Sequence, residues 1–350
     1  MDDLIRNGRL RRSIAVSVPS RAALAGNPSD LAESQGIGAV LSMPLWDFKA
    51  TAALLPGQSF AVYCPKSAAS NLRERAGALA RQGVGDWENP VDCSISTFDR
   101  MLQSVDREMM NIPLSVHLDT DIPRQRGMSG SSGMVIALLK ALLIVHDLRD
   151  HEAFLPHKLA EWALGIETTL GITAGLQDRV LQCYAGAVQD MDALYMDFSQ
   201  QVDDGSNYKP ISSVSPLPKM ALVLSSQPSH SGSAHTAVKT RIEERDAQVL
   251  ADMKELAGYA NEASEALQNG DWHRLGELMN LNAQGRLRIY GAEALGPVNT
   301  ELMSACEKAF CPANFTGSGG AMIALLPEGK DSLGRLRREL GHEYEVYAVN

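Results

Sequence analysis

The chain has 350 residues, which is long enough for two domains because single hydrophobic cores usually stop growing at about 250–300 residues. Lys and Arg total 32 against 42 Asp and Glu, and the net charge of -10 argues against a broad basic surface that binds nucleic acid. No apolar run reaches about 18 residues, so we expect no membrane-spanning helix. The five scattered cysteines form no Cys-x-x-Cys pair, which indicates reduced thiols in a cytoplasmic protein and neither disulfides nor a zinc site.

The first two hundred residues alternate between strand and helix patterns. Alternating apolar residues predict a strand over 14–18 that ends at Pro19 and feeds a turn reaching Asp30. The other elements predicted here are strands over 37–45, 59–64, 114–118 and 189–199, and helices over 66–82, over 131–146, over 156–165 and opening in 171–180.

A polar segment over 203–218, rich in proline and serine, is typical of a linker or domain crossing. We therefore predict an N-terminal domain over 1–212 and a C-terminal domain over 213–350. Beyond the segment, the pattern predicts a strand over 220–224, helices over 238–268, 271–289 and 299–310, and glycine-bearing strands over 311–326.

The segment 127–133 combines glycines and serines directly before a long apolar helix. A strand precedes it, and the order strand, glycine loop, helix brings backbone N–H groups and the positive end of a helix dipole to one place. This arrangement favours phosphate binding. The spacing and lysine of a Walker A loop are absent, so the loop is of another type. The alternative is a glycine-rich turn that caps a buried helix.

Two more glycine-bearing segments, 26–30 and 316–320, lie near the ends of the chain. With the loop at 127–133 and the segment Gly175-Leu-Gln-Asp-Arg179, their order resembles the GHMP kinases over most of the chain. The first motif departs from the family pattern, since Ser20 stands where the family has glycine. The resemblance implies an α+β, two-domain GHMP kinase fold, with a ribosomal-S5-domain-2-like N-terminal domain, a ferredoxin-like C-terminal domain, and both substrates in the cleft between the halves.

Within the family, the chain is similar to the plant-type glucuronokinases. The similarity covers Gly26-Asn-Pro-Ser-Asp30, Ile122-Pro-Arg-Gln125, Ala174 to Val180, Met196 to Ser199 and Phe315 to Gly320. It implies a kinase that uses ATP and Mg²⁺ to phosphorylate the anomeric hydroxyl of D-glucuronate. The expected partners are therefore a small sugar acid and ATP, with no nucleic acid and no membrane.

Each motif has a role in phosphoryl transfer by this resemblance. Backbone N–H groups of Gly127, Ser129, Gly130, Ser131, Ser132 and Gly133 would hold the phosphates, with Gly317 and Gly319 of the third turn contributing. The family pattern selects Ser132 as the hydroxyl that contacts Mg²⁺.

Asp178 is the predicted catalytic residue, because similar kinases have an aspartate at this position that accepts or steers the proton of the sugar hydroxyl. Arg21, carried over from the first motif, would favour its charged form and face the γ-phosphate. Glu167 precedes Asp178 by 11 residues, the separation of a metal-binding glutamate in mevalonate kinases, and is a candidate second Mg²⁺ ligand. The alternatives are an ordinary acid at a helix start, a surface cation and a solvated glutamate.

Substrate choice is expected to depend on the first turn. Galactokinases have a glutamate where this chain has Asn27, and the loss of a negative charge suits a sugar that carries a carboxylate. Asp30 would accept hydrogen bonds from sugar hydroxyls, and Thr316 is a further predicted contact. The carboxylate needs a cation, for which Arg124, Arg126 and Arg179 are candidates; Arg124 is preferred because the glucuronokinases share its context.

Two other functions stay open. The first is another GHMP sugar 1-kinase, acting on galacturonate, galactose, fucose or a heptose. The second is a catalytically silent relative that binds sugar and nucleotide as a sensor, against which the presence of Asp178 and Arg21 argues.

Overall fold

The computed structural model describes residues 4–58, 61–62, 90–172, 175–200, 202–226, 232–328, 331–341 and 344–349. The predicted helix over 66–82 and most of the predicted strand over 59–64 lie outside these residues. The chain divides into two compact units. Unit 1 comprises Met1–Ser20, Phe48–Ile122 and Gly130–Ala187, and unit 2 comprises Arg21–Asp47, Pro123–Ser129 and Val188–Asn350.

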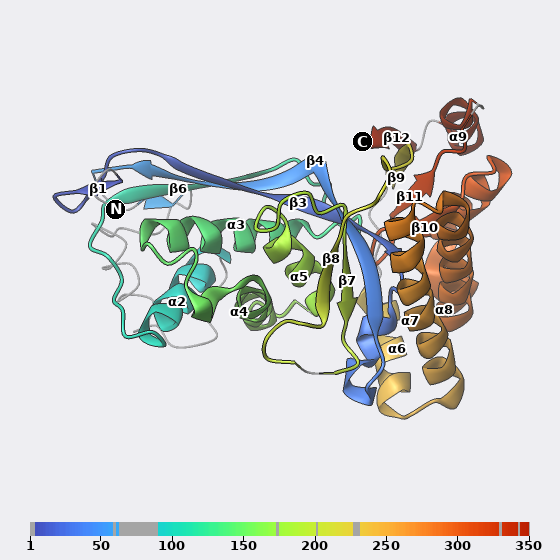
Figure 1. The fold of residues 1–350 in the computed structure, drawn as a ribbon, viewed down its shortest axis with the longest axis horizontal. Coiled ribbons are helices and arrows are strands. Elements are labelled where there is room, and N and C mark those ends of the chain that lie inside the picture. Colours follow the sequence, from blue (N-terminus) through green and yellow to red (C-terminus); the bar gives the residue numbers. More distant parts are fainter. Residues whose placement is uncertain are drawn as a thin grey trace. The chain divides into compact units, whose positions relative to one another are not determined.

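Unit 1 is built on two long strands, β3 (Ile14–Ala25) and β4 (Ala39–Pro56), which pair with each other and continue into unit 2. Within unit 1, β4 pairs antiparallel with β6 (Leu114–Thr120), which pairs parallel with β5 (Ala61–Val62). The strands β1 (Ile5–Arg6) and β2 (Arg9–Leu10) form a separate hairpin. Helices cover one side of the long strands (Figure 1): α2 (Pro90–Gln103), α3 (Gly130–Val145), α4 (Pro156–Thr169) and α5 (Leu176–Tyr184), with a 3-10 turn, η2 (Glu152–Phe154), before α4.

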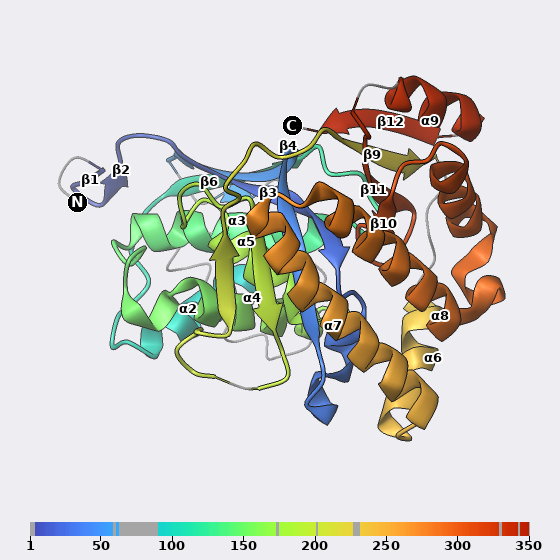
Figure 2. The ribbon, with the colours of Figure 1, turned by 45° about the vertical axis from the view of Figure 1, so that its right-hand side comes forward.

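Unit 2 contains two groups of strands. The Ala39–Ser42 part of β4 pairs with β7 (Ala193–Asp197), which pairs with β8 (Tyr208–Ile211). A separate antiparallel sheet has the order β10-β11-β9-β12, made of β9 (Met220–Ser225), β10 (Ala313–Phe315), β11 (Ala321–Leu325) and β12 (Tyr344–Val349). Unit 2 also contains helical elements, several of which are visible in Figure 2. They are η1 (Ser29–Gln35), α6 (Gly232–Glu243), α7 (Ala247–Asn269), α8 (Trp272–Lys308) and α9 (Ser332–Leu340).

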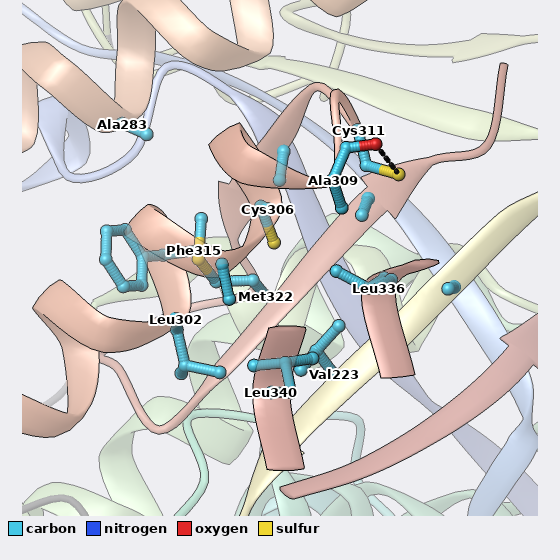
Figure 3. Packing of buried hydrophobic residues seen from close by; sticks show 14 of the residues in the cluster. Val223, Ala283, Leu302, Cys306, Ala309, Cys311, Phe315, Met322, Leu336 and Leu340 are labelled. Carbon is cyan, nitrogen blue, oxygen red and sulfur yellow. Dashed lines mark hydrogen bonds between the residues drawn. The ribbon is translucent and has the colours of Figure 1, made fainter. Parts of the chain in front are cut away.

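The core of unit 2 forms where α8 and α9 pack on the four-stranded sheet. Figure 3 shows Val223 and Met322 of the sheet facing Leu302 of α8 and Leu336 and Leu340 of α9. All five side chains are buried, and each fully buried aliphatic side chain contributes about 1.5–3 kcal/mol to folding. This packing fixes the ends of β10 and β11, and hence the glycine-rich turn that joins them.

Several predicted boundaries differ from the structure. The first strand does not end at Pro19 but continues to Ala25. Among the described strands its sheet partner is β4, and a proline, which has no N–H to donate, is tolerated in a strand that is paired on one side. The single helix predicted over 238–268 breaks before α7, where Arg245 has a φ of 58° and Asp246 caps the new helix. The helices predicted over 271–289 and 299–310 correspond to the two parts of α8, which a kink separates where Gly291 and Gly296 have non-helical backbone angles.

The predicted linker over 203–218 contains the short strand β8, which pairs with β7. The predicted domain boundary at residue 212 stays a prediction. Among the described residues, no helix combines the length and the apolar character needed to cross a membrane.

A buried histidine joins α3 to the segment after α2. The Nε2 atom of His146 accepts a hydrogen bond from Met110 N at 3.2 Å, so its proton lies on Nδ1, which donates to Leu142 O at 2.9 Å. Its ring packs edge-on against Phe98, with 5.0 Å between the ring centroids. Burial lowers the pKa of His146 from 6.5 to about 4, so the folded protein holds it neutral.

We predict that this histidine makes unit 1 sensitive to acid. The unfolded chain binds a proton at His146 near pH 6.5, whereas the folded protein does so only near pH 4, so stability is complete above the first value and declines as the pH falls toward the second. The loss is at most about 3 kcal/mol. In chemical denaturation from pH 7.5 to 4, the His146→Gln variant should lack this decline, and exposed His273 changed to Gln should keep it. Parallel stability curves for His146→Gln and the parent would contradict the prediction.

Candidate active site

The predicted site residues fall into two groups, one in each compact unit. The loop at 127–133 itself divides between them, since Gly127 and Ser129 belong to unit 2 and Gly130 to Gly133 belong to unit 1.

In unit 1, Gly130, Ser131, Ser132 and Gly133 form the first turn of α3. The N–H groups of a first helical turn have no partner within the helix, and the helix dipole adds positive charge, so this turn suits an anion. A Cβ on Gly133 would lie 3.2 Å from Ala50 Cβ, so only glycine fits without displacing its neighbours.

Gln182 fixes this turn to the rest of unit 1. Its Oε1 accepts a hydrogen bond from Ser132 Oγ at 2.7 Å, and its Nε2 donates to Pro19 O at 3.0 Å. Gln182 and Ser132 are fully buried. The Ser132 hydroxyl is therefore engaged within the protein.

Glu167 is a buried carboxylate with partners on both oxygens. Its Oε1 accepts from Ser131 Oγ at 2.7 Å, and its Oε2 accepts from Arg179 Nε at 2.5 Å and pairs with Arg179 Nη2. Arg179 is also buried, and its Nη1 donates to Gly175 O at 2.8 Å. A buried ion pair whose atoms are all hydrogen-bonded holds two helices, α4 and α5, in one register.

Asp178 lies in the first turn of α5, where a carboxylate is favoured by the helix dipole. Its Oδ2 is 3.7 Å from Arg179 Nη1, and its side chain is 19% exposed, in contrast to fully buried Glu167. At the other end of α5, the Lys140 ammonium donates to the carbonyls of Gln182, Cys183 and Ala185. Both ends of the helix that carries Asp178 are thus fixed.

These contacts bear on the predicted Mg²⁺ ligands. The Ser132 hydroxyl donates a hydrogen bond to Gln182, and the Glu167 carboxylate forms an ion pair with buried Arg179. Mg²⁺ requires oxygen ligands at about 2.0–2.1 Å, and both the donating Ser132 hydroxyl and the Glu167 carboxylate keep lone pairs besides those in these contacts. Among the described residues, no group of three His, Cys, Asp or Glu side chains could hold a metal. The Mg²⁺ site made of Ser132 and Glu167 stays a prediction.

In unit 2, Arg21 joins the first and third motifs. This buried guanidinium donates to Gly127 O at 2.8 Å and to Thr316 O, and Thr316 Oγ1 donates to Gly127 O at 3.3 Å. Gly127 has a φ of +60°, and a Cβ on Gly317 would lie 2.4 Å from Arg21 Nη1. Both positions therefore require glycine.

Asn27 belongs to a buried network of three asparagines. Its Oδ1 accepts from Asn282 Nδ2 at 3.1 Å and from Asn314 Nδ2 at 2.8 Å, and its Nδ2 donates to Phe315 O at 3.2 Å. Asn282 Oδ1 also accepts from Gly26 N at 2.7 Å. The Asn27 amide is thus occupied within the protein, which supports a role in shaping the first turn; its predicted contact with substrate stays a prediction.

Three arginines are the predicted partners of a sugar carboxylate, and their surroundings differ. Arg179 is paired with Glu167, and Arg126 donates to the carbonyls of Ser225 and Ser226 at 2.6 Å each. Arg124 is exposed, and its guanidinium forms no ion pair with the described part of the chain. Asp30 is half-buried at the start of η1.

The sequence is similar to those of known kinases. Residues 95–186 match the family model described as "GHMP kinases N terminal domain", and residues 263–346 match "GHMP kinases C terminal". Glucuronokinase 1 from Arabidopsis thaliana is 32% identical over 327 residues, which is 91% of this chain and 87% of that protein. The chain belongs to the GHMP kinases.

Solved structures of other GHMP kinases share the fold. The galactokinase of Lactococcus lactis superposes with a TM-score of 0.71 at 15% identity, covering 97% of this chain and 93% of that one. The mevalonate kinase of Methanococcus jannaschii gives 0.67 at 18% identity, covering 97% and 98%. A second relative, Probable glucuronokinase 2 from Arabidopsis thaliana, is 38% identical over 63% of this chain and 59% of that protein. The predicted two-domain α+β GHMP kinase fold and the transfer of phosphate from ATP are confirmed.

Several buried polar residues of this GHMP kinase were not predicted from sequence motifs. Gln182, Lys140, Asn282, Asn314 and Arg286 are all buried or nearly so and hold the glycine loops or the Asp178 helix. Lys140 carries a local signal, because it is a charged residue inside the strongly apolar helix α3, whereas Arg286 lies in α8 among many polar and charged residues. Their partners lie far away in the sequence, so the signal predicts a buried contact without naming it.

We predict that Arg179 stabilises unit 1 chiefly by neutralising Glu167. Arg179→Met leaves a buried carboxylate without its cation and should lower the free energy of unfolding by about 3–5 kcal/mol in urea denaturation. Adding Glu167→Gln to this variant should recover part of the loss, because a neutral amide is easier to bury. Arg149→Met, which breaks an exposed pair with Asp150, should change stability by less than about 1 kcal/mol. Equal losses in Arg179→Met and Arg149→Met would contradict the prediction.

Proposed function

We propose that this GHMP kinase transfers the γ-phosphoryl group of ATP to the anomeric hydroxyl of a hexuronic acid, D-glucuronate first, giving the sugar 1-phosphate. The observation that carries the proposal is the 32% identity to Glucuronokinase 1 across 91% of the chain. Phosphoryl transfer requires the protein to align the hydroxyl with the phosphate and to neutralise charge, and both groups of predicted residues supply parts for this.

For the phosphate, the proposal uses backbone N–H groups. The first turn of α3, from Gly130 to Gly133, presents helix-start N–H groups in unit 1. In unit 2, Gly127, Ser129, Gly317 and Gly319 belong to segments that approach closely enough to exclude any side chain at Gly127 and Gly317. Mg²⁺ enters the proposal as the counter-ion of ATP, with Ser132 and Glu167 as its proposed protein ligands.

For the acceptor, the proposal assigns the proton of the sugar hydroxyl to Asp178. Among the acids of unit 1 that motif analysis selects, Asp178 is partly exposed, whereas Glu167 is enclosed by Ser131 and Arg179. Arg21 supplies a buried cation in unit 2 for charge that develops on the transferred group.

For the sugar acid, the proposal uses Arg124 to pair with the carboxylate. Arg126 and Arg179 already donate to protein oxygens, whereas the exposed Arg124 side chain keeps its fork of donors for a carboxylate. Asp30 and Thr316 remain the proposed contacts to sugar hydroxyls.

The test of substrate is turnover of ATP with a sugar panel. We expect phosphorylation of D-glucuronate to exceed that of galacturonate, galactose, fucose and heptoses, and we expect phosphorus NMR of the product to show an anomeric phosphate. Turnover of a neutral sugar with none of glucuronate would overturn the substrate assignment in favour of another sugar 1-kinase. Absence of turnover with every sugar, together with intact ligand binding, would favour the sensor.

Asp178→Asn serves as the negative control for the same assay. If Asp178 handles the proton, this variant should bind ATP nearly as the parent does while turnover falls by about 10²–10⁴-fold. Glu161→Gln, an exposed change on α4, should leave both unchanged. Parental turnover in Asp178→Asn would remove Asp178 from the mechanism.

A further inference from the structure

Arg286 is a buried cation in unit 2 that no motif assigns. It lies on α8 with 1% of its surface exposed, and its guanidinium carbon is 5.0 Å from the ring centroids of both Phe315 and Tyr290. It forms no ion pair with a carboxylate in the described part of the chain, and its Nε has no hydrogen-bond partner there. Burial lowers the pKa of Arg286. A guanidinium buried without an ion pair is costly for stability, which makes Arg286 a candidate for function.

The hydrogen bonds of Arg286 all go to the glycine-rich turn between β10 and β11. Its Nη1 donates to Gly317 O at 2.6 Å and its Nη2 donates to Ser318 O at 2.8 Å. Arg21 holds the preceding carbonyl, that of Thr316. Two arginines therefore bind three successive carbonyl groups of one turn.

This binding fixes where the N–H groups of the turn point. In a trans peptide unit, the C=O of one residue and the N–H of the next point in opposite directions. Because the carbonyls of Gly317 and Ser318 face Arg286, the N–H groups of Ser318 and Gly319 face away from it.

Neither of these N–H groups donates a hydrogen bond to the described residues, whereas the next one, Gly320 N, donates to Asn299 Oδ1 at 2.8 Å. Both nitrogen atoms lie near Gly127, where a Cβ would be 2.7 Å from Ser318 N and 3.0 Å from Gly319 N, so a side chain at residue 127 would crowd them. Successive backbone N–H groups in such a turn form an anion-binding nest.

We propose that Arg286 is a positioning residue for substrate binding, which orients the N–H groups of Ser318 and Gly319 toward an oxyanion of a bound substrate. The proposal rests on the proposed function, which supplies two such oxyanions, the phosphates of ATP and the carboxylate of the sugar acid. The local charge adds to the attraction. Arg286 interacts electrostatically with a second cation, Arg21, and with one carboxylate, Asp30, so the three groups together carry a net positive charge.

The experiment measures binding of ATP alone and of D-glucuronate alone to the full chain by titration calorimetry. Arg286→Met should weaken at least one of the two by 10-fold or more (about 1.4 kcal/mol). Arg288→Met is the matched control, because Arg288 lies on the same helix but pairs with Asp252 and Glu255 and is 45% exposed; it should bind both ligands as the parent does.

The two ligands distinguish the source of the oxyanion. A loss confined to ATP identifies a phosphate at Ser318 and Gly319, and a loss confined to glucuronate identifies the carboxylate. A purely structural role would lower the fraction of protein that binds while leaving the dissociation constant of that fraction unchanged, and this result would overturn the proposal. Equal losses in Arg286→Met and Arg288→Met would also overturn it.

Two further outcomes are decisive. If Arg286→Met does not fold, Arg286→Gln takes its place, because its side chain is shorter and uncharged and does not reproduce the two-pronged contact of a guanidinium; unchanged affinity in this variant contradicts the proposal. If the parent binds ATP but not glucuronate, the substrate assignment fails while the ATP titration still tests Arg286. Binding of neither ligand by the parent would contradict both.

Discussion

Hydrogen bonds from buried guanidinium groups to main-chain carbonyls are the interaction on which the glycine-rich segments of unit 2 depend. Glycine-rich turns have many conformations of similar energy, and side-chain packing does little to select one because glycine has no side chain. Arg21 and Arg286 select one by binding the carbonyls of Thr316, Gly317 and Ser318, and Arg21 extends the same restraint to Gly127. The asparagine network around Asn27 adds the first turn to this set.

In unit 1, a helix and buried polar side chains hold the glycine-bearing turn in one conformation. Its glycine-bearing turn is the start of a helix, so its geometry is set by α3, and the surrounding polar side chains fix the neighbouring helices. Gln182 holds Ser132, the Glu167–Arg179 pair joins α4 to α5, and Lys140 binds the last carbonyls of α5. The helix that carries Asp178 is thereby held at both ends before any substrate binds, which reduces the ordering required at the moment of reaction.

Local signals predict the elements of this fold better than its contacts. The strand at 114–120, the glycine loop and the helix α3 follow from alternation, glycine spacing and an apolar run, and all three are present. Asn27 shows the limit: its missing charge suggests a substrate contact, but its partners, Asn282 and Asn314, lie more than 250 residues away and no local pattern names them. Arg286 shows it again, since α8 contains many polar and charged residues and no local pattern sets this arginine apart.

The central claim is that two arginines turn the N–H groups of the residue 316–320 turn toward an anionic substrate. Amide chemical shifts in a titration with ATP and with glucuronate test it most directly. The account predicts that the amide signals of Ser318 and Gly319 move strongly downfield with at least one ligand, while that of Gly320, already bonded to Asn299, moves little. Unmoved signals from Ser318 and Gly319 at saturation with both ligands would contradict it.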